Sequence, residues 1–170
     1  MPQPPVTVSK SGPGFAQVLK DIRRLQKCDV LVGIPAEKTQ RKRQAINNAS
    51  LLFIHTKGSE VMNIPPRPVL EPSIIENRGI ITPHLGQAAT LLLNARPVDA
   101  ERELKLAGIT AANGAKRYFL EGKLAPNKPA TIARKRRKAK LGEGEEYVDT
   151  PLIDTGQMRR AITSVVRYGY

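Results

Sequence analysis

Few side chains in this chain could do acid–base, nucleophilic or metal chemistry. The 170 residues hold two histidines, His55 and His84, and one cysteine, Cys28. None of them stand at a metal-ligand spacing such as His-x-x-x-His, so the spacing argues against a zinc site. Cys28 stands just before an apolar run, which favours a packing role over a reactive thiol. For His55 we expect hydrogen bonding near a helix end.

The triplet Asp154, Thr155 and Gly156 also occurs in aspartic proteases, whose chemistry needs two carboxylates that share a proton. Pro151 ahead of it and the basic pair at 159–160 behind it favour a different interpretation. We expect a turn in which the Asp154 and Thr155 side chains cap the amides of a short helix. The sequence offers no Gly-x-Ser-x-Gly elbow, phosphate-cradling glycine loop or Cys–His nucleophile pair. We therefore predict no catalytic residue, cofactor or metal, and a protein that is not an enzyme.

The strongest electrostatic feature is a basic run in a chain whose formal net charge is +13. Such a run attracts either nucleic-acid phosphates or an acidic protein surface, and the sequence leaves both open. It has no interleaved aromatic residues for base stacking, so we do not expect sequence-specific readout. The run consists of Arg134, Lys135, Arg136, Arg137, Lys138 and Lys140.

Length and composition indicate one domain, at residues 15–170, preceded by a flexible arm at 1–14 that is rich in proline and glycine. Apolar residues make up 40% of the chain and aromatic residues only 4%, so the core must consist of Leu, Ile, Val and Ala. The chain has no apolar run near 20 residues and no signal-like start, which predicts no membrane partner. A lone cysteine fits a reducing cytoplasm.

The first half of the chain predicts two helices around one strand. Apolar spacing indicates a helix over 15–27, then a strand over 29–35, in which Gly33 suggests close packing or a bulge. A loop at 36–44 precedes a helix over 45–56 that ends at Gly58. We expect the buried stripe of that helix to consist of Ile46, Ala49 and Phe53.

The second half predicts further helices and a final strand. Residues 71–95 read as helical with an interruption near Gly79, after which Thr82 and Pro83 would start a second helix. A helix over 98–122 carries a narrow stripe of small and apolar residues, whose members are Leu104, Ala107, Ala111, Ala115 and Phe119. We expect an exposed, mobile arm at about 123–149, and the β-branched run at 161–168 predicts a C-terminal strand.

Three stretches of this chain resemble, in order and spacing, the phage neck and tail-completion proteins, a family with Mu-like and lambdoid-like members. Thr131 and Ile132 match a Pro-x-Thr-Ile element, and Val69, Met158 and Ala161 stand where the family commonly has Phe, Leu and Ser. The other two stretches, 48–70 and 151–163, carry the structural residues of the resemblance, which are Asn48, His55, Gly58, Ile64, Pro65, Arg67, Pro68, Leu70, Pro151, Leu152, Asp154, Thr155 and Gly156.

The resemblance implies an α+β fold with a small mixed or antiparallel sheet packed against helices. It also implies a virion structural protein of the head–tail connector region, or collar, that is made in the host cytoplasm. Such proteins form a homo-oligomeric ring, sixfold or twelvefold, between the connector and the tail-terminator or tail proteins, and genomic DNA passes through the lumen. Two alternatives stay open, a tail terminator and a basic protein that binds nucleic acid without sequence preference. The Ile-Pro-x-Arg-Pro segment favours tail completion over a terminator.

Overall fold

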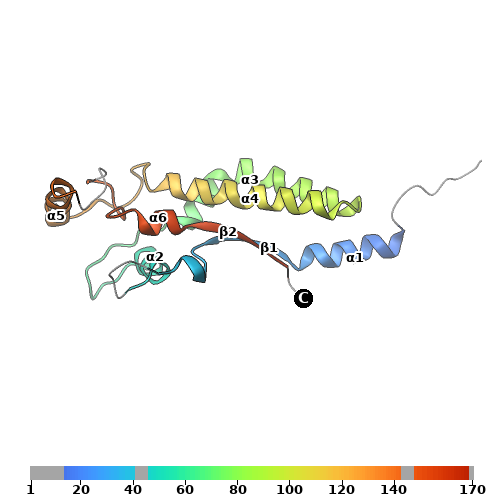
Figure 1. Ribbon diagram of the computed structural model, residues 1–170, viewed down its shortest axis with the longest axis horizontal. Coiled ribbons are helices and arrows are strands. Elements are labelled where there is room, and N and C mark those ends of the chain that lie inside the picture. Colours follow the sequence, from blue (N-terminus) through green and yellow to red (C-terminus); the bar gives the residue numbers. More distant parts are fainter. Residues whose placement is uncertain (1–13, 41–45, 143–147, 169–170) are drawn as a thin grey trace, which may run out of the picture.

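A computed structural model describes residues 14–40, 46–142 and 148–168 (Figure 1). Two long helices, α3 (Leu70–Leu93) and α4 (Pro97–Tyr118), form a hairpin that runs along a two-stranded antiparallel sheet of β1 (Cys28–Gly33) and β2 (Thr163–Tyr168). Helix α1 (Phe15–Gln26) extends from one end of this body. At the other end lie α2 (Asn48–Lys57), α5 (Pro129–Lys140) and α6 (Gln157–Ala161). This arrangement confirms the predicted α+β class; the predicted arm at 1–14, apart from Gly14, lies outside the described residues.

The sheet joins the two ends of the chain. Strands β1 and β2 pair in a continuous register from Cys28 opposite Tyr168 to Gly33 opposite Thr163. Alternation along the strands turns one face towards α4, while Leu31 and Val165, directly opposite each other, are 44% and 47% exposed on the other face. The predicted close packing or bulge at Gly33 is wrong, because the pairing is regular there and no other atom lies within 4 Å of an added Cβ.

Helix α4 lies between α3 and the sheet, and it carries the core. The predicted stripe of small and apolar residues is buried throughout, from Leu104 to Phe119, which confirms that part of the sequence analysis. Pro97 occupies the first turn of the helix, where its missing N–H costs no hydrogen bond. At Gly108 the backbone of α4 comes so close to β1 and β2 that a side chain would meet Val30 and Ser164.

Replacing Gly108 with alanine is therefore expected to lower the free energy of unfolding by about 1–3 kcal/mol. The new Cβ would lie 2.8 Å from Ser164 Cβ, which moves only with its strand, and 3.1 Å from Val30 Cγ1. Urea unfolding checks this against Gly86→Ala on α3, where the Cβ meets nothing within 4 Å. The control should gain roughly 0.5–1 kcal/mol from helix propensity. Equal gains in both variants would show that α4 does not need this close approach.

Helix α3 is continuous, so the predicted interruption near Gly79 and the second start at Thr82-Pro83 are wrong. Pro83 lies inside the helix, where it removes one backbone hydrogen bond and would ordinarily favour a break. The long contact with α4 along the hairpin outweighs this local cost. Because this contact joins two separate helices, a pattern of neighbouring residues in the sequence does not predict it.

Helix α2 begins three residues later than predicted, and its buried face differs. The Asn47 side chain accepts a hydrogen bond from the backbone N–H of Ser50 (2.8 Å), which fixes the start of the helix. Ile46 then precedes the helix and Phe53 is 65% exposed, while Asn48 and Leu52 face the interior. The predicted buried stripe is therefore wrong: the face of α2 that is buried carries Asn48 and Leu52, and Phe53 lies outside it.

Candidate functional site

The basic run at 134–140 belongs to helix α5, so the predicted mobile arm is wrong for this segment. Pro129 stands in the first turn, and the Ala, Arg and Lys residues that follow have high helix propensity. The helix ends before Gly142, which adopts φ +69°, the left-handed conformation common after a helix C-terminus. Residues 143–147 of the predicted arm lie outside the described part of the chain.

Polar contacts hold α5 to the segment that precedes α6. Lys135 is 8% exposed, and its Nζ donates to the backbone oxygen of Thr150 (2.6 Å). Lys138 Nζ lies 3.0 Å from Asp154 Oδ2, and Arg136 Nη2 lies 3.4 Å from Asp149 Oδ1. The basic run is thus partly structural, since three of its cations fix the helix in place.

Arg67 is the most buried arginine of the described residues, at 7% exposure. Its Nε donates to the Ala125 oxygen (2.7 Å) and its Nη2 to the Pro126 oxygen (2.8 Å). Its own backbone N–H donates to the His55 oxygen (2.6 Å) at the last turn of α2. Arg67 therefore connects two of the three stretches that carry the resemblance, 48–70 and 125–132.

Gly58 ends α2 in a conformation that only glycine adopts readily, φ 76° and ψ −179°. A short loop follows and closes where Ser59 and Ile64 exchange two backbone hydrogen bonds, at 2.8 and 2.9 Å. This loop places Pro65 and Arg67 in the lining of a pocket that they share with α5. Asn48, 2% exposed, lies elsewhere: its side-chain amide donates to the backbone oxygens of Lys38 and Gln40, both at 3.3 Å.

The turn at 151–156 directs side chains both inward and towards α5. Leu152 has a positive φ of 63°, which is uncommon outside glycine, and the next residue, Ile153, is 1% exposed. Gly156, at φ 66°, caps α6 without a side-chain hydrogen bond. The predicted capping by Asp154 and Thr155 is therefore wrong, and Asp154 pairs with Lys138 of α5 instead.

These elements line a half-open pocket with a volume of about 570 Å³, which we call the α5 cavity. Its walls bring together three members of the basic run and eight of the structural residues of the resemblance. They are Arg134, Lys135 and Lys138 from α5, and His55, Ile64, Pro65, Arg67, Leu152, Asp154, Thr155 and Gly156. Asn48, Gly58, Pro68, Leu70 and Pro151 do not line it, and Arg136, Arg137 and Lys140 lie at another hollow along α5 with Pro129 and Ile132.

Burial weakens the proton affinity of two cations in these walls. It lowers the pKa of Lys135, against the opposing influence of Asp154 and Asp149, because a buried ammonium loses its hydration. Burial likewise lowers the pKa of Arg67, although a guanidinium still keeps its proton in proteins. The walls thus contain several cations, and burial removes part of the hydration of two of them. The surface of the cavity is electropositive and partly desolvated. Its chemistry suits the binding of an anion.

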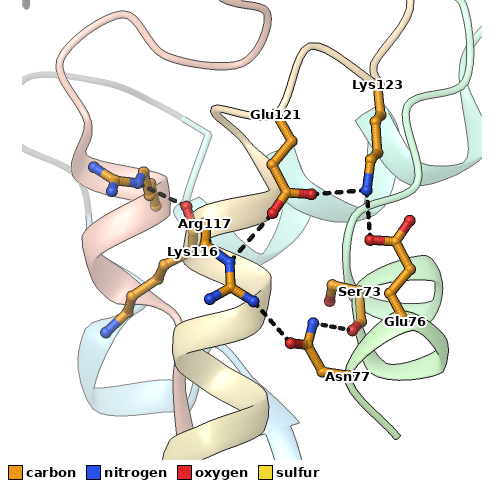
Figure 2. A network of polar contacts seen from close by, with 8 residues as sticks. Ser73, Glu76, Asn77, Lys116, Arg117, Glu121 and Lys123 are labelled. Atoms are coloured by element: carbon orange, nitrogen blue, oxygen red, sulfur yellow. Dashed lines mark hydrogen bonds and ion pairs between the residues drawn. The ribbon is translucent and has the colours of Figure 1, made fainter. Parts of the chain in front are cut away.

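A polar network between α3 and α4 was missed at the sequence level (Figure 2). Arg117 donates to Asn77 Oδ1 (2.8 Å) and to Glu121 (3.2 Å), and Asn77 Nδ2 donates to the Ser73 oxygen (2.7 Å). Gly114 leaves room for this amide, since a Cβ there would lie 2.8 Å from Asn77 Nδ2. The one available signal was the spacing of four between Arg117 and Glu121.

The network extends beyond the end of α4 to Lys123 (Figure 2). Lys123 Nζ lies 2.6 Å from Glu76 and 2.9 Å from Glu121, so it connects α3 with the turn after α4. Arg159 of α6 donates to the Lys116 oxygen at 2.9 Å. These contacts fix the relative positions of α3, α4 and α6, and Gln157 and Met158 of α6 line the α5 cavity.

Among residues 14–40, 46–142 and 148–168, no three His, Cys, Asp or Glu side chains lie together where they could hold a metal ion. Cys28 is partly buried against the core, and burial raises the pKa of its thiol. None of the helices in the described ranges has the length and apolarity needed to span a bilayer. No protein-family model, curated protein or solved structure matches the chain.

Proposed function

We propose that this chain is a structural virion protein of the phage neck, acting in tail completion or as a connector ring between head and tail. In this role it forms a homo-oligomeric ring, sixfold or twelvefold, that contacts the adjacent connector and the tail-terminator or tail proteins. Genomic DNA passes through the lumen. The protein is made in the host cytoplasm and ends in the virion.

One observation carries this proposal: the three stretches that resemble the family meet at one place. The Arg67 guanidinium binds the carbonyls of Ala125 and Pro126, and Arg67 and Asp154 line the same cavity. These residues are 58, 59 and 87 positions apart in sequence, by subtraction of their numbers. Short matches that arise by chance have no reason to pack together. Their convergence supports one shared structural unit.

Uncovered apolar surface supports a subunit rather than an isolated monomer. Helix α1 carries Phe15, Leu19 and Ile22 at 79%, 38% and 39% exposure, and the outer face of the sheet carries the pair Leu31 and Val165. Apolar side chains left exposed together on one face of a helix or sheet mark candidate interaction sites in soluble proteins. Head-to-tail contacts between identical subunits close into rings.

A second candidate function is the binding of nucleic acid without sequence preference. The side of α5 away from the cavity favours it, because Arg136, Arg137 and Lys140 line a shallow hollow there. A protein of that kind would bind duplex DNA with an affinity that falls steeply as salt rises.

Native mass measurement and negative-stain imaging of the purified protein, with and without duplex DNA, separate the two functions. We expect closed rings at both about 50 mM and about 200 mM salt, with weak DNA binding. A monomer that forms rings only when connector or tail components are added also fits the neck role. A monomer or dimer that coats DNA at the lower salt, releases it at the higher salt and never assembles would contradict it.

A further inference from the structure

We propose that the α5 cavity is a docking site for an acidic peptide segment of a partner protein, one in which a carboxylate stands beside apolar side chains. The inference rests on the proposed function, because a neck subunit must bind neighbouring proteins. The two can nevertheless fail separately, as the experiment below is designed to show.

The first reason is a buried cation without a carboxylate. Arg67 is 7% exposed and lines the cavity, yet its guanidinium donates only to the two carbonyls of Ala125 and Pro126 among the described residues. Two of its five N–H donors are used in this way. Burying a charge without a counter-charge is costly, so an anion that enters this cavity gains a preformed electrostatic attraction.

The second reason is the charge of the walls as a whole. Five cations line the cavity against one carboxylate, Asp154, which leaves a net charge of +4 (5 − 1) without counting His55. Lys138 and Asp154 form an ion pair whose two side chains are both 36% exposed, so an incoming carboxylate can also reach Lys138. The five cations are Arg67, Lys128, Arg134, Lys135 and Lys138.

The third reason separates a peptide from duplex DNA. Partly exposed apolar groups of Leu51, Ile64, Pro65 and Leu152 share the lining with the cations, and Met62, 70% exposed, also belongs to it. Apolar walls gain free energy by covering apolar side chains, which a phosphate backbone does not supply. A concave site of about 570 Å³ is of the size that takes a few side chains, whereas duplex DNA is a stiff, wide rod.

Two arginines of α5 provide a matched pair of variants. Arg134 lines the α5 cavity and Arg137 lies at the other hollow, both are exposed, and neither makes an ion pair among the described residues. Arg134→Glu and Arg137→Glu each change the net charge from +13 to +11, since +1 becomes −1. They therefore have the same effect on non-specific electrostatic attraction and differ only in the cavity.

The probe is a short fluorescein-labelled peptide of alternating leucine and glutamate, measured by fluorescence anisotropy with the full chain. We expect the wild type and Arg137→Glu to bind it equally and Arg134→Glu to bind about tenfold more weakly, because a like charge enters the site. The same peptide with glutamine in place of glutamate should bind weakly to all three. Circular dichroism confirms that each variant is folded.

Several results would overturn the inference. They are equal binding by the two variants, equal binding of the glutamine peptide, and displacement of the peptide by duplex DNA whose own binding is lost in Arg134→Glu but not in Arg137→Glu. The last result would make the cavity a phosphate site. Rings that form but bind no peptide would remove the docking site alone. A chain that binds the peptide but never joins a ring would remove the neck role alone.

Discussion

Replacing Gly58 with alanine is expected to lower the free energy of unfolding by about 3 kcal/mol, or to prevent folding. The backbone at this position has φ 76° and ψ −179°, a region that a residue with a Cβ enters only with strain. The added Cβ would also lie 2.9 Å from both the Ile64 oxygen and the Pro66 nitrogen. Both are backbone atoms, so relief requires the loop that carries Arg67 to move.

Urea unfolding followed by circular dichroism measures this loss, and Gly79→Ala is the control. Gly79 lies in the exposed middle of α3, where an added Cβ meets nothing within 4 Å. Alanine there should raise the free energy of unfolding by up to about 1 kcal/mol through helix propensity. The same Gly→Ala substitution is thus expected to lower the free energy of unfolding at Gly58 and to raise it at Gly79. A stabilised Gly58→Ala variant would contradict the conformation of this loop.

Replacing Arg67 with alanine is expected to lower the free energy of unfolding by about 2–4 kcal/mol. The change removes two charge-assisted hydrogen bonds, to Ala125 and Pro126, and it leaves both carbonyls without this partner. The loss should loosen the segment that leads into α5, and hence the α5 cavity.

Two further variants show whether the loss belongs to the geometry of Arg67 rather than to charge. Arg78→Ala removes an exposed arginine from α3 and should change the free energy of unfolding by less than about 0.5 kcal/mol. Arg67→Lys keeps the charge but cannot hold two carbonyls with a planar fork, so we expect it to recover only part of the stability. Full recovery by lysine would show that only the charge matters.

Several features could be predicted from the sequence because their causes are local. The β-branched run before Gly169 and the compact apolar run after Cys28 predict strands, and both form. The spacing of three and four from Leu104 to Phe119 identifies the buried face of α4, because that face repeats with the helix period. Gly58 was recognised as a helix end for the same kind of reason.

Other features could not be predicted because distant contacts decide them. Pro83 stays inside α3 because the hairpin with α4 outweighs one missing hydrogen bond. The buried face of α2 is set by Asn48, whose side chain binds the backbone oxygens of Lys38 and Gln40, and by Leu52, which packs in the core. Asp154 could have capped α6, but Lys138 of α5 takes its carboxylate instead.

Composition and short-range patterns were enough to predict the α+β class, the basic charge and the positions of most helices and strands. These follow from composition and from short periodic patterns. Tertiary contacts were needed to show that the basic run is a helix, that three of its residues line one cavity, and that Arg67 lies buried in the wall of that cavity. The physical reason is that a charge run has no periodicity of its own. Which of its side chains face solvent depends on what packs against the helix, and here that is the segment at 149–154.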